Sequence, residues 1–190
     1  MVTGAGSGVG QSIIKALRIS SLNLNIIAAD INELNAALYR TKKSIIIPPI
    51  EKKNSLNLII KILKKNKIDV LFVGSELEID FFSNYKQLIE RETDTLISAT
   101  KIDVVKICND KFASIEFFRK NKIKHPESHI INSFSNLNSV FKKIKKPFIL
   151  KSRFGTSARS VHVINNKKDF INKIAIVKKP MIQEYLGKNN

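Results

Sequence analysis

The stretch TGAGSGVG, residues 3–10, decides the expected fold. A strand that turns directly into a helix needs residues that tolerate positive φ and close backbone approach, and glycine supplies both. Such a turn leaves free N–H groups at the start of the helix, where an anion is favoured. Because Ile13, Ile14 and Leu17 then form one apolar stripe, the stretch predicts a strand–turn–helix unit with its helix over residues 8–20.

Several nucleotide-binding templates compete for this turn. Its glycines have the TGxxxGxG spacing of short-chain dehydrogenases, whereas Val9 occupies the position of the third glycine in GxGxxG. A Walker A loop is excluded, because no Gly-Lys-Ser/Thr follows. Dehydrogenases of this class also need a catalytic Tyr with a Lys four residues later. The only such pair, Tyr39 and Lys43, comes too early to reach a nicotinamide ring, which counts against this class. An NAD(P)-binding oxidoreductase is kept only as an alternative.

Asp30 follows the turn by about 20 residues, where a dinucleotide-binding fold places a carboxylate for the ribose. It ends an expected strand over residues 24–29. Asp30 and Glu33 also have the spacing of a capping box ahead of an apolar stripe. We favour this second interpretation, in which Asp30 starts a helix over residues 33–38.

Composition limits the class of protein. A chain of 190 residues can form one large domain or two small ones. Its single cysteine, Cys108, excludes an internal disulfide and a zinc site built on several thiolates. The sequence contains neither an apolar run near 18 residues nor a signal-peptide pattern, so we expect a cytoplasmic protein without a membrane partner.

The formal net charge of +17 would ordinarily suggest a nucleic-acid partner. Lysines are spread over predicted helix faces, however, and no RNA- or DNA-binding motif accompanies them. We therefore expect no nucleic acid as partner, although a non-enzymatic basic binding module stays open as a second alternative. The same charge would attract ATP or an acidic substrate equally well.

The order of elements separates two regions. Up to about residue 100, short strands and helices alternate, which predicts a parallel sheet with helices on its faces. The expected strands there are 2–3, 24–29, 44–47, 69–73 and 95–98, and the helices 8–20, 33–38, 55–66 and 79–91. Beyond this region we expect helices 102–108, 111–121, 135–144 and 167–174, and strands 147–151, 161–164 and 181–184. The strands around the loop 152–160 predict a hairpin that can close over a ligand.

Charged groups of the second region stand in suggestive places. Lys111 lies at an expected helix start, which is unfavourable for a cation unless an anion is also bound there. Lys151 ends an apolar strand. The loop from Arg153 to Ser160 combines hydroxyls, N–H groups and guanidinium groups, all of which suit phosphate.

In this order, the segments TGAGSGVGQSIIKAL, GSELE, NDKFAS, PFILKSRFGTSARSVHVI and MIQEYLG resemble the ATP-grasp superfamily. The resemblance is greatest to its members similar to the carbamoyl-phosphate synthase large subunit, and it covers the whole chain. It implies an α/β fold with two domains. Residues 1–107 would form a Rossmann-like pre-ATP-grasp domain with a parallel sheet, and residues 108–190 the N-terminal, α+β part of an ATP-grasp domain.

The resemblance also implies an ATP site. Lys111 and Lys151 would contact the phosphates of ATP, and the loop from Phe154 to Ser160 would fold over the triphosphate. Gly155 would make that loop flexible, although the family's loops carry more glycines. The remaining implied contacts are Thr156, Ser157 and Arg159 to phosphate, and Gln183 with the backbone of Glu184 and Leu186 to adenine.

By the same resemblance, ATP phosphorylates a small-molecule carboxylate to an acyl phosphate, which an amine or another nucleophile then attacks. Mg²⁺ would assist, but its ligands in the family lie downstream of the segment that matches residues 183–186. We therefore expect no metal site in this chain and an inactive fragment of a larger ligase. A homo-oligomer stays open as the assembly. The non-nucleotide substrate would face Gly6, Ser7, Gly8, Ser75 and Glu76, where Ser75 and Glu76 can equally be a helix start.

Overall fold

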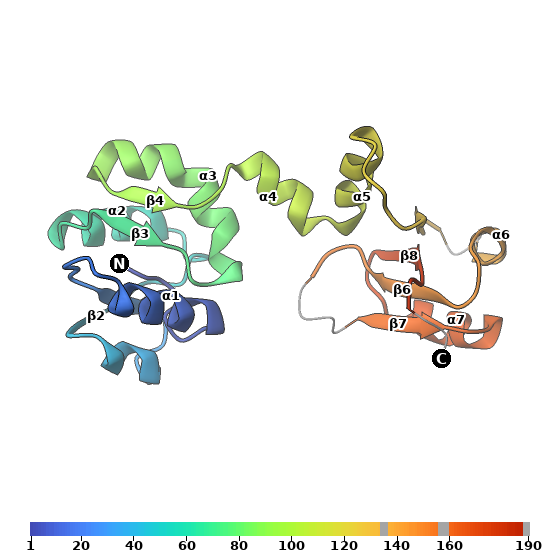
Figure 1. The fold of residues 1–190 in the computed structure, drawn as a ribbon, viewed down its shortest axis with the longest axis horizontal. Helices are drawn as coiled ribbons and strands as arrows, with labels where there is room; N and C mark the ends of the chain where they lie inside the picture. The colour runs from blue at the N-terminus through green and yellow to red at the C-terminus, as the bar shows by residue number, and fades with distance from the viewer. Residues whose placement is uncertain (134–136, 156–159, 188–190) are drawn as a thin grey trace. The chain divides into compact units, whose positions relative to one another are not determined.

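The structure is a computed structural model, and it describes residues 1–133, 137–155 and 160–187. The chain divides into two units, Met1–Val105 and Lys106–Asn190, and each is described here by itself (Figure 1).

A parallel sheet forms the centre of the first unit, as the sequence predicts. Its paired strands are β1 (Ile27–Asp30) with β2 (Lys43–Ile46), and β3 (Val70–Phe72) with β4 (Leu96–Ser98). Val2 makes parallel bridges to Ala28 of β1 and to Phe72 of β3. The residues just before the glycine turn therefore lie in the middle of the sheet, between the two pairs.

Helices cover both faces of this sheet. They are α1 (Gly8–Ile19), the 3-10 helix η1 (Ala36–Arg40), α2 (Ser55–Lys65) and α3 (Glu76–Thr93). Ile14 of α1 belongs to one core cluster with Ala28, whereas Leu63 of α2 and Phe82 of α3 belong to another with Leu71. Because successive side chains of a strand point to opposite faces, one short strand can serve both clusters.

The capping role that we expected for Asp30 is wrong. The turn that follows is η1, which begins later than the expected helix 33–38, and its N-cap is Asn35, whose side chain accepts a hydrogen bond from the N–H of Ala37. Asp30 is the last residue of β1 and is buried. Its carboxylate accepts hydrogen bonds from the N–H groups of Gly6 and Asn32 and from the side chain of Asn35, so it binds the glycine turn to the end of β1.

An antiparallel sheet of four strands, in the order β5-β8-β6-β7, forms the second unit. The strands are β5 (Ser128–Ile130), β6 (Phe148–Ser152), β7 (Val161–Ile164) and β8 (Pro180–Glu184). Lys151 pairs with Val161 in the register of β6 and β7, which confirms the predicted hairpin. The short strand β5 was not predicted, because three residues are too few to show an alternating pattern.

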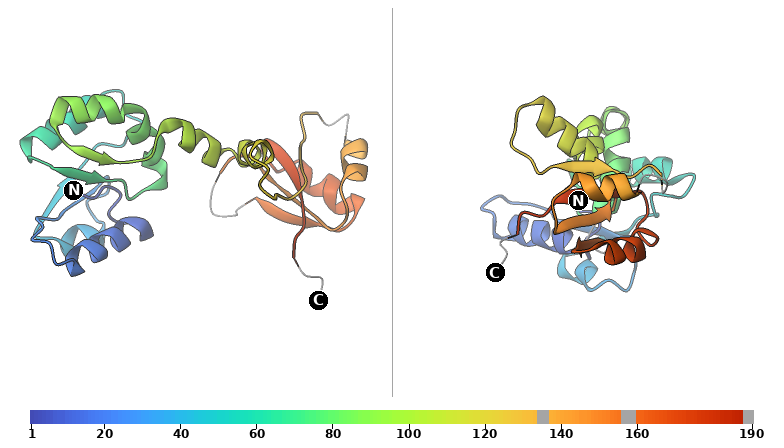
Figure 2. Two further views of the ribbon diagram at one scale, coloured as in Figure 1. Left: turned by 45° about the horizontal axis from the view of Figure 1, so that its top comes forward. Right: turned by 90° about the vertical axis from the view of Figure 1, so that its right-hand side faces the viewer.

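Two helices of this unit pack on one face of its sheet, as Figure 2 shows from further directions. They are α6 (Leu137–Lys143) and α7 (Lys167–Ile174), and they share a core with Phe148, Leu150 and Ile182. The helix α4 (Ile102–Asn109) precedes α5 (Lys111–Lys120), which makes contacts with β5. The face opposite α6 and α7 carries the polar groups described next.

Candidate functional site

Lys151 lies near the end of β6, on the sheet face opposite α6 and α7. Phe148 and Leu150 enter the core beneath those helices, and alternation along the strand places Lys151 on the other side. Its half-buried ammonium donates a hydrogen bond of 2.6 Å to Oε1 of Gln183 on β8. Gln183 donates through Nε2 to the hydroxyl of Ser128 on β5, at 2.9 Å. Three strands thus contribute to one polar chain on this face.

The charge of Lys151 is poorly compensated. Burial is the main reason that the pKa of Lys151 lies below its ordinary value, and the positive charge of Lys111 lowers this pKa further. The acceptor of its hydrogen bond is a neutral amide oxygen. A bound anion would favour the charged form of Lys151, because it would offset both effects. The surroundings of this lysine therefore fit a ligand with negative charge.

Lys111 is the first residue of α5, and two hydrogen bonds connect it to the segment after β6. Its backbone N–H donates to the carbonyl of Arg153 at 3.0 Å, and its ammonium donates to the carbonyl of Gly155 at 2.6 Å. The first turn of α5 is without an acidic side chain, so a cation there is opposed by the helix dipole. Lys111 and Lys151 thus come close enough to influence each other at the base of the loop 153–160, and their contact with a ligand stays a prediction.

Asp110 connects the start of α5 to the end of β6, and the sequence did not predict this contact. As the N-cap of α5, its carboxylate accepts hydrogen bonds from the N–H groups of Phe112 and Ala113. The same carboxylate pairs with the guanidinium of Arg153, whose Nε lies 2.7 Å from Oδ1 and whose Nη2 binds Oδ2. The hydrogen bonds from Arg153 are the main cause that holds the pKa of Asp110 below its ordinary value.

This pairing changes the expectation for Arg153. We expected its guanidinium to suit phosphate, but the structure engages it in a two-point contact with Asp110. Asn and Asp ahead of a helix are a recognisable signal for the N-cap. No local signal indicates an ion-pair partner so distant in the sequence.

The other predicted ATP contacts are placed as follows. Glu184 ends β8, and its backbone N–H already donates to the carbonyl of Glu127 at 2.8 Å, while Leu186 lies beyond the strand and is exposed. Gly155 is the last described residue before residues 156–159 and has a φ of 102°. Three predicted phosphate donors lie outside the described residues: Thr156, Ser157 and Arg159.

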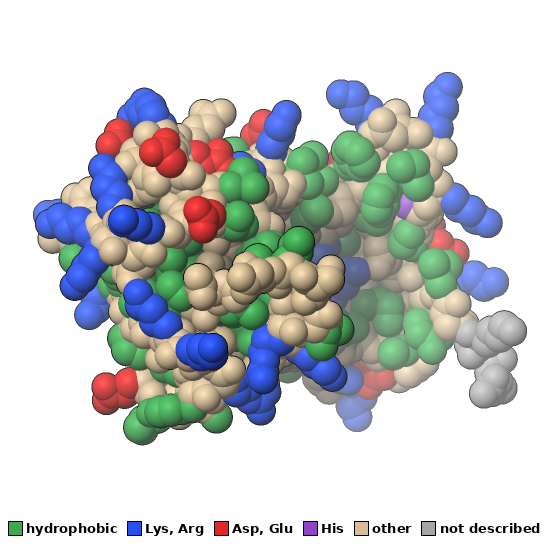
Figure 3. All heavy atoms as spheres, turned by 60° about the vertical axis from the view of Figure 1, so that its left-hand side comes forward, with side chains coloured by type: hydrophobic (Ala, Val, Ile, Leu, Met, Phe, Trp, Pro, Cys, Tyr) green, Lys and Arg blue, Asp and Glu red, His purple; other side chains and the backbone are tan. Residues whose placement is uncertain are grey.

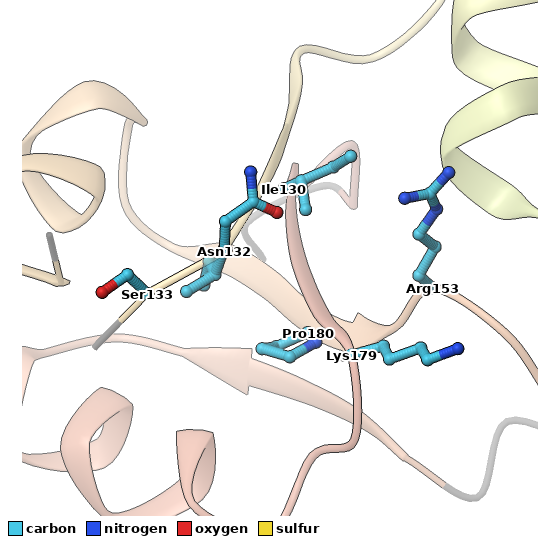
Figure 4. Close-up of a pocket in the computed structure, with 7 residues that line it drawn as sticks. Ile130, Asn132, Ser133, Arg153, Lys179 and Pro180 are labelled. Carbon is cyan, nitrogen blue, oxygen red and sulfur yellow. The ribbon is translucent and has the colours of Figure 1, made fainter. Parts of the chain in front are cut away.

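A cavity of about 340 Å³ lies at the end of the same sheet. In the view of Figure 4, Asn132 and Ser133 lie toward one side of it, and Arg153 and Lys179 lie toward the other. The ammonium of Lys179 lies 4.9 Å from the centre of the Phe154 ring. This cavity therefore has basic side chains at the base of the loop 153–160.

The glycine turn of the first unit uses N–H donors within the chain. Gly6 donates to Oδ2 of Asp30 at 2.8 Å, and Gly10 donates to the hydroxyl of Ser7, the N-cap of α1, at 2.8 Å. A dinucleotide-binding fold would offer such donors to a pyrophosphate. Here a pyrophosphate would compete with a buried carboxylate, which counts against the NAD(P) alternative.

A second cavity, of about 220 Å³, lies where the parallel strands of the first unit end. Asp30, Glu51 and Glu78 line it together with Ser7, Ser75 and other residues, and we call it the acidic cavity. Glu78 is 5% exposed. Burial is the main cause that raises the pKa of Glu78 above its ordinary value, and the charges of Asp30 and Glu51 raise it further, whereas a hydrogen bond with Thr3 opposes them.

The predicted substrate residues are only partly brought together. Ser7 and Ser75 line the acidic cavity, but Gly6, Gly8 and Glu76 are not among its lining residues. Ser75 is the N-cap of α3 by position, and its side chain makes no capping hydrogen bond. Sequence reasoning missed Glu78 as a functional candidate, because its place in the first turn of α3 is equally typical of an exposed residue.

Within residues 1–133, 137–155 and 160–187, no group of three or more His, Cys, Asp or Glu residues could hold a metal ion, and Asp110 near Lys111 is paired with Arg153. On the face drawn in Figure 3, Lys and Arg side chains are spread among hydrophobic and uncharged groups. Among the described helices, none has the length and apolar character needed to cross a membrane.

Two family models match the chain, and they meet near the boundary between its two structural units. The family described as PylC-like, N-terminal domain matches residues 1–97, and the family described as RimK-like ATP-grasp domain matches residues 108–190. No curated protein matches the sequence.

Solved structures share the fold. N5-carboxyaminoimidazole ribonucleotide synthetase from Thermotoga maritima is 20% identical with a TM-score of 0.69, covering 97% of this chain and 45% of its own. N5-carboxyaminoimidazole synthetase from Staphylococcus aureus, complexed with ADP, is 17% identical with a TM-score of 0.72. The match covers 99% of this chain and 47% of that one. The biotin carboxylase domain of 2-oxoglutarate carboxylase from Hydrogenobacter thermophilus, with MgADP, is 14% identical with a TM-score of 0.73. The match covers 97% of this chain and 43% of that one. The chain thus spans less than half the length of these structures.

Proposed function

We propose that this chain is the ATP-binding portion of an ATP-dependent ligase. The chain belongs to the ATP-grasp proteins, since it joins a PylC-like N-terminal domain to a RimK-like ATP-grasp segment. The ligase joins a carboxylate to an amine or a related nucleophile by way of an acyl phosphate. Neighbours of the same fold include complexes with ADP and MgADP, which supports ATP as the nucleotide.

One observation carries this proposal: two lysines from separate elements lie close enough for the charge of Lys111 to act on Lys151. The ammonium of Lys151 is half-buried, has a lowered pKa and feels the charge of Lys111. Lys111 is bound to the loop 153–160 through Gly155. These two cations would hold the phosphates of ATP, while Gln183 beside Lys151 offers polar groups to the base.

When bound, ATP would supply the phosphoryl group that activates the carboxylate. The residues of this chain contribute position and charge, which are the main needs of phosphoryl transfer. Asp110 pairs with Arg153 and so fixes the start of the loop beside Lys111. The narrower likeness to carbamoyl-phosphate synthase, the assistance of Mg²⁺, a homo-oligomeric state and a cytoplasmic location stay predictions.

Titration of the 190-residue chain with ATP by calorimetry tests the proposal. Lys151→Met should weaken ATP binding by about 10- to 100-fold, as expected for the loss of a charge-assisted contact. Lys142→Met, at an exposed position in the last turn of α6, is the matched control and should bind ATP as the parent chain does.

The rival functions give different results in the same assay. An NAD(P)-binding oxidoreductase would bind NADH and would lose this binding in Gly8→Val, with Lys151→Met unaffected. A basic binding module would bind duplex DNA with a steep inverse dependence on salt. Equal ATP affinity of the parent chain and Lys151→Met, or a failure of the chain to bind ATP, would overturn the proposal.

A further inference from the structure

The acidic cavity is a local exception on a basic protein. The chain carries 33 Lys and Arg against 16 Asp and Glu. None of the described residues that line the cavity is Lys or Arg, yet three are acidic: Asp30, Glu51 and Glu78. They come from the end of β1, from the segment between β2 and α2, and from the first turn of α3. The fold thus gathers negative groups from three separate segments around one space.

Glu78 gives a second and independent indication of a ligand. Its side chain is more than nine-tenths buried, and within the described part of the chain its Oε2 has no hydrogen-bond partner. A buried carboxyl oxygen without a donor is costly, and such groups in folded proteins are normally satisfied by a protein group, a water molecule or a ligand. A ligand with a hydrogen-bond donor would satisfy this oxygen in the ionised form of Glu78, because an ionised carboxylate only accepts.

The charges also indicate which donor suits the cavity. Asp30 already accepts hydrogen bonds from Gly6, Asn32 and Asn35 beside the cavity. Glu51 is exposed at the rim. A phosphate or carboxylate placed here would meet like charges, whereas a group with several N–H donors and a positive charge would satisfy Glu78 and offset all three carboxyls.

We propose that the acidic cavity binds a primary ammonium group of the substrate, with Glu78 and Glu51 as acceptors and Asp30 as a fixed negative charge. The proposal rests on the proposed function only in taking this amine-bearing molecule to be a substrate of the ligase. Ser7 and Ser75 supply neutral polar groups to the same wall.

Proton linkage follows from the same arrangement. The charged groups that act on Glu78 are Asp30 and Glu51, and a hydrogen bond with Thr3 acts in the opposite direction. An ammonium group prefers the ionised form of Glu78, so its binding should lower the pKa of that carboxyl and release a proton. Affinity should therefore rise as the pH rises toward and through the raised pKa of Glu78.

The experiment uses the full 190-residue chain and three probes of equal size, 1-propylammonium, 1-propanol and propionate, with binding followed by NMR titration. Propylammonium should bind at least roughly 10-fold more tightly than either other probe, the effect expected of one charge-assisted contact. Glu78→Gln and Glu51→Gln should each weaken its binding by about the same factor. Glu33→Gln, which changes an exposed acid outside the cavity, is the matched control.

Exposed Glu51 keeps the test informative if Glu78→Gln disturbs folding. Equal binding of propanol, tighter binding of propionate, or unchanged binding in Glu51→Gln would overturn the inference. Lys151→Met separates it from the proposed function, because this change should weaken ATP binding without altering the affinity for propylammonium. If the chain binds ATP but shows no preference for propylammonium, the inference alone is rejected. If it prefers propylammonium but does not bind ATP, the proposed function alone is rejected.

Discussion

The guanidinium of Arg153 and the carboxylate of Asp110 form a two-point ion pair that connects the end of β6 to the first turn of α5. The same carboxylate caps α5, so one side chain stabilises a helix start and positions the loop that follows β6. This arrangement places the base of the loop beside Lys111, whose backbone N–H donates to the carbonyl of Arg153.

Replacing Asp110 should therefore cost more than the loss of a helix cap. Asn166 caps α7 through its side chain without an Arg partner, so Asn166→Ala serves as the control and should destabilise by about 0.5–2 kcal/mol. Asp110→Ala should exceed this control by about 1 kcal/mol, because it also leaves Arg153 without its acceptor. Urea unfolding of both variants measures the difference, and equal losses would show that the ion pair adds nothing.

The pH dependence of stability should carry the signature of Asp110. Since its pKa is lowered in the folded chain, the parent's advantage over Asp110→Asn should be fully present above the ordinary Asp pKa of about 3.9 and lost as the pH falls through the lowered value. Urea unfolding at a series of acidic pH values measures this, and a constant difference between the two proteins would contradict it.

Two glycines of the same turn should respond oppositely to alanine. A Cβ on Gly10 would lie 2.3 Å from the carbonyl oxygen of Gly4 and 2.9 Å from Cα of Ala5, so Gly10→Ala should destabilise by about 1–3 kcal/mol. A Cβ on Gly8 meets no heavy atom within 4 Å, and Gly8→Ala should stabilise α1 by about 0.4–1 kcal/mol. Thermal unfolding of the pair decides, and similar losses in both would contradict this account of the turn.

ATP affinity should fall at alkaline pH. The pKa of Lys151 is lowered by burial and by Lys111, so this ammonium loses its proton before an ordinary lysine does. Binding to the parent chain should weaken as the pH rises through that lowered pKa, whereas Lys151→Met should lack this component. Lys151→Arg retains its charge over the range and should retain its affinity. Calorimetric titrations at several pH values check the prediction, which fails if the parent chain and Lys151→Met show the same pH profile.

Glu78 should make the protein less stable as the pH rises. Between the ordinary Glu pKa of about 4.3 and the raised pKa of Glu78, the folded chain binds more protons than the unfolded chain, so stability decreases across this window. Glu78→Gln removes this slope, and its stability relative to the parent should increase with pH. Glu33→Gln is the control for an exposed acid, and a parallel pH profile of Glu78→Gln and the parent would refute the effect.

Local patterns were sufficient for much of the fold. Alternating strands and helices predicted the parallel sheet of the first unit, and the apolar segments around the loop 152–160 predicted the hairpin of β6 and β7. These signals work because the side-chain period of a strand or helix is repeated within a few residues. The 3-10 helix η1 and the strand β5 are too short to repeat a period, and both were missed or misplaced.

By itself, the sequence determined that a glycine turn begins a parallel sheet and that Lys111 and Lys151 stand at element ends where a cation is unusual. Only the tertiary structure decided what these groups meet. Asp30 proved to bind the glycine turn, Asp110 to pair with Arg153, and Glu78 to lie in a cavity with other acids. The physical reason is that propensity and periodicity act over a few residues, whereas burial, ion pairing and pKa shifts depend on groups that only packing brings together.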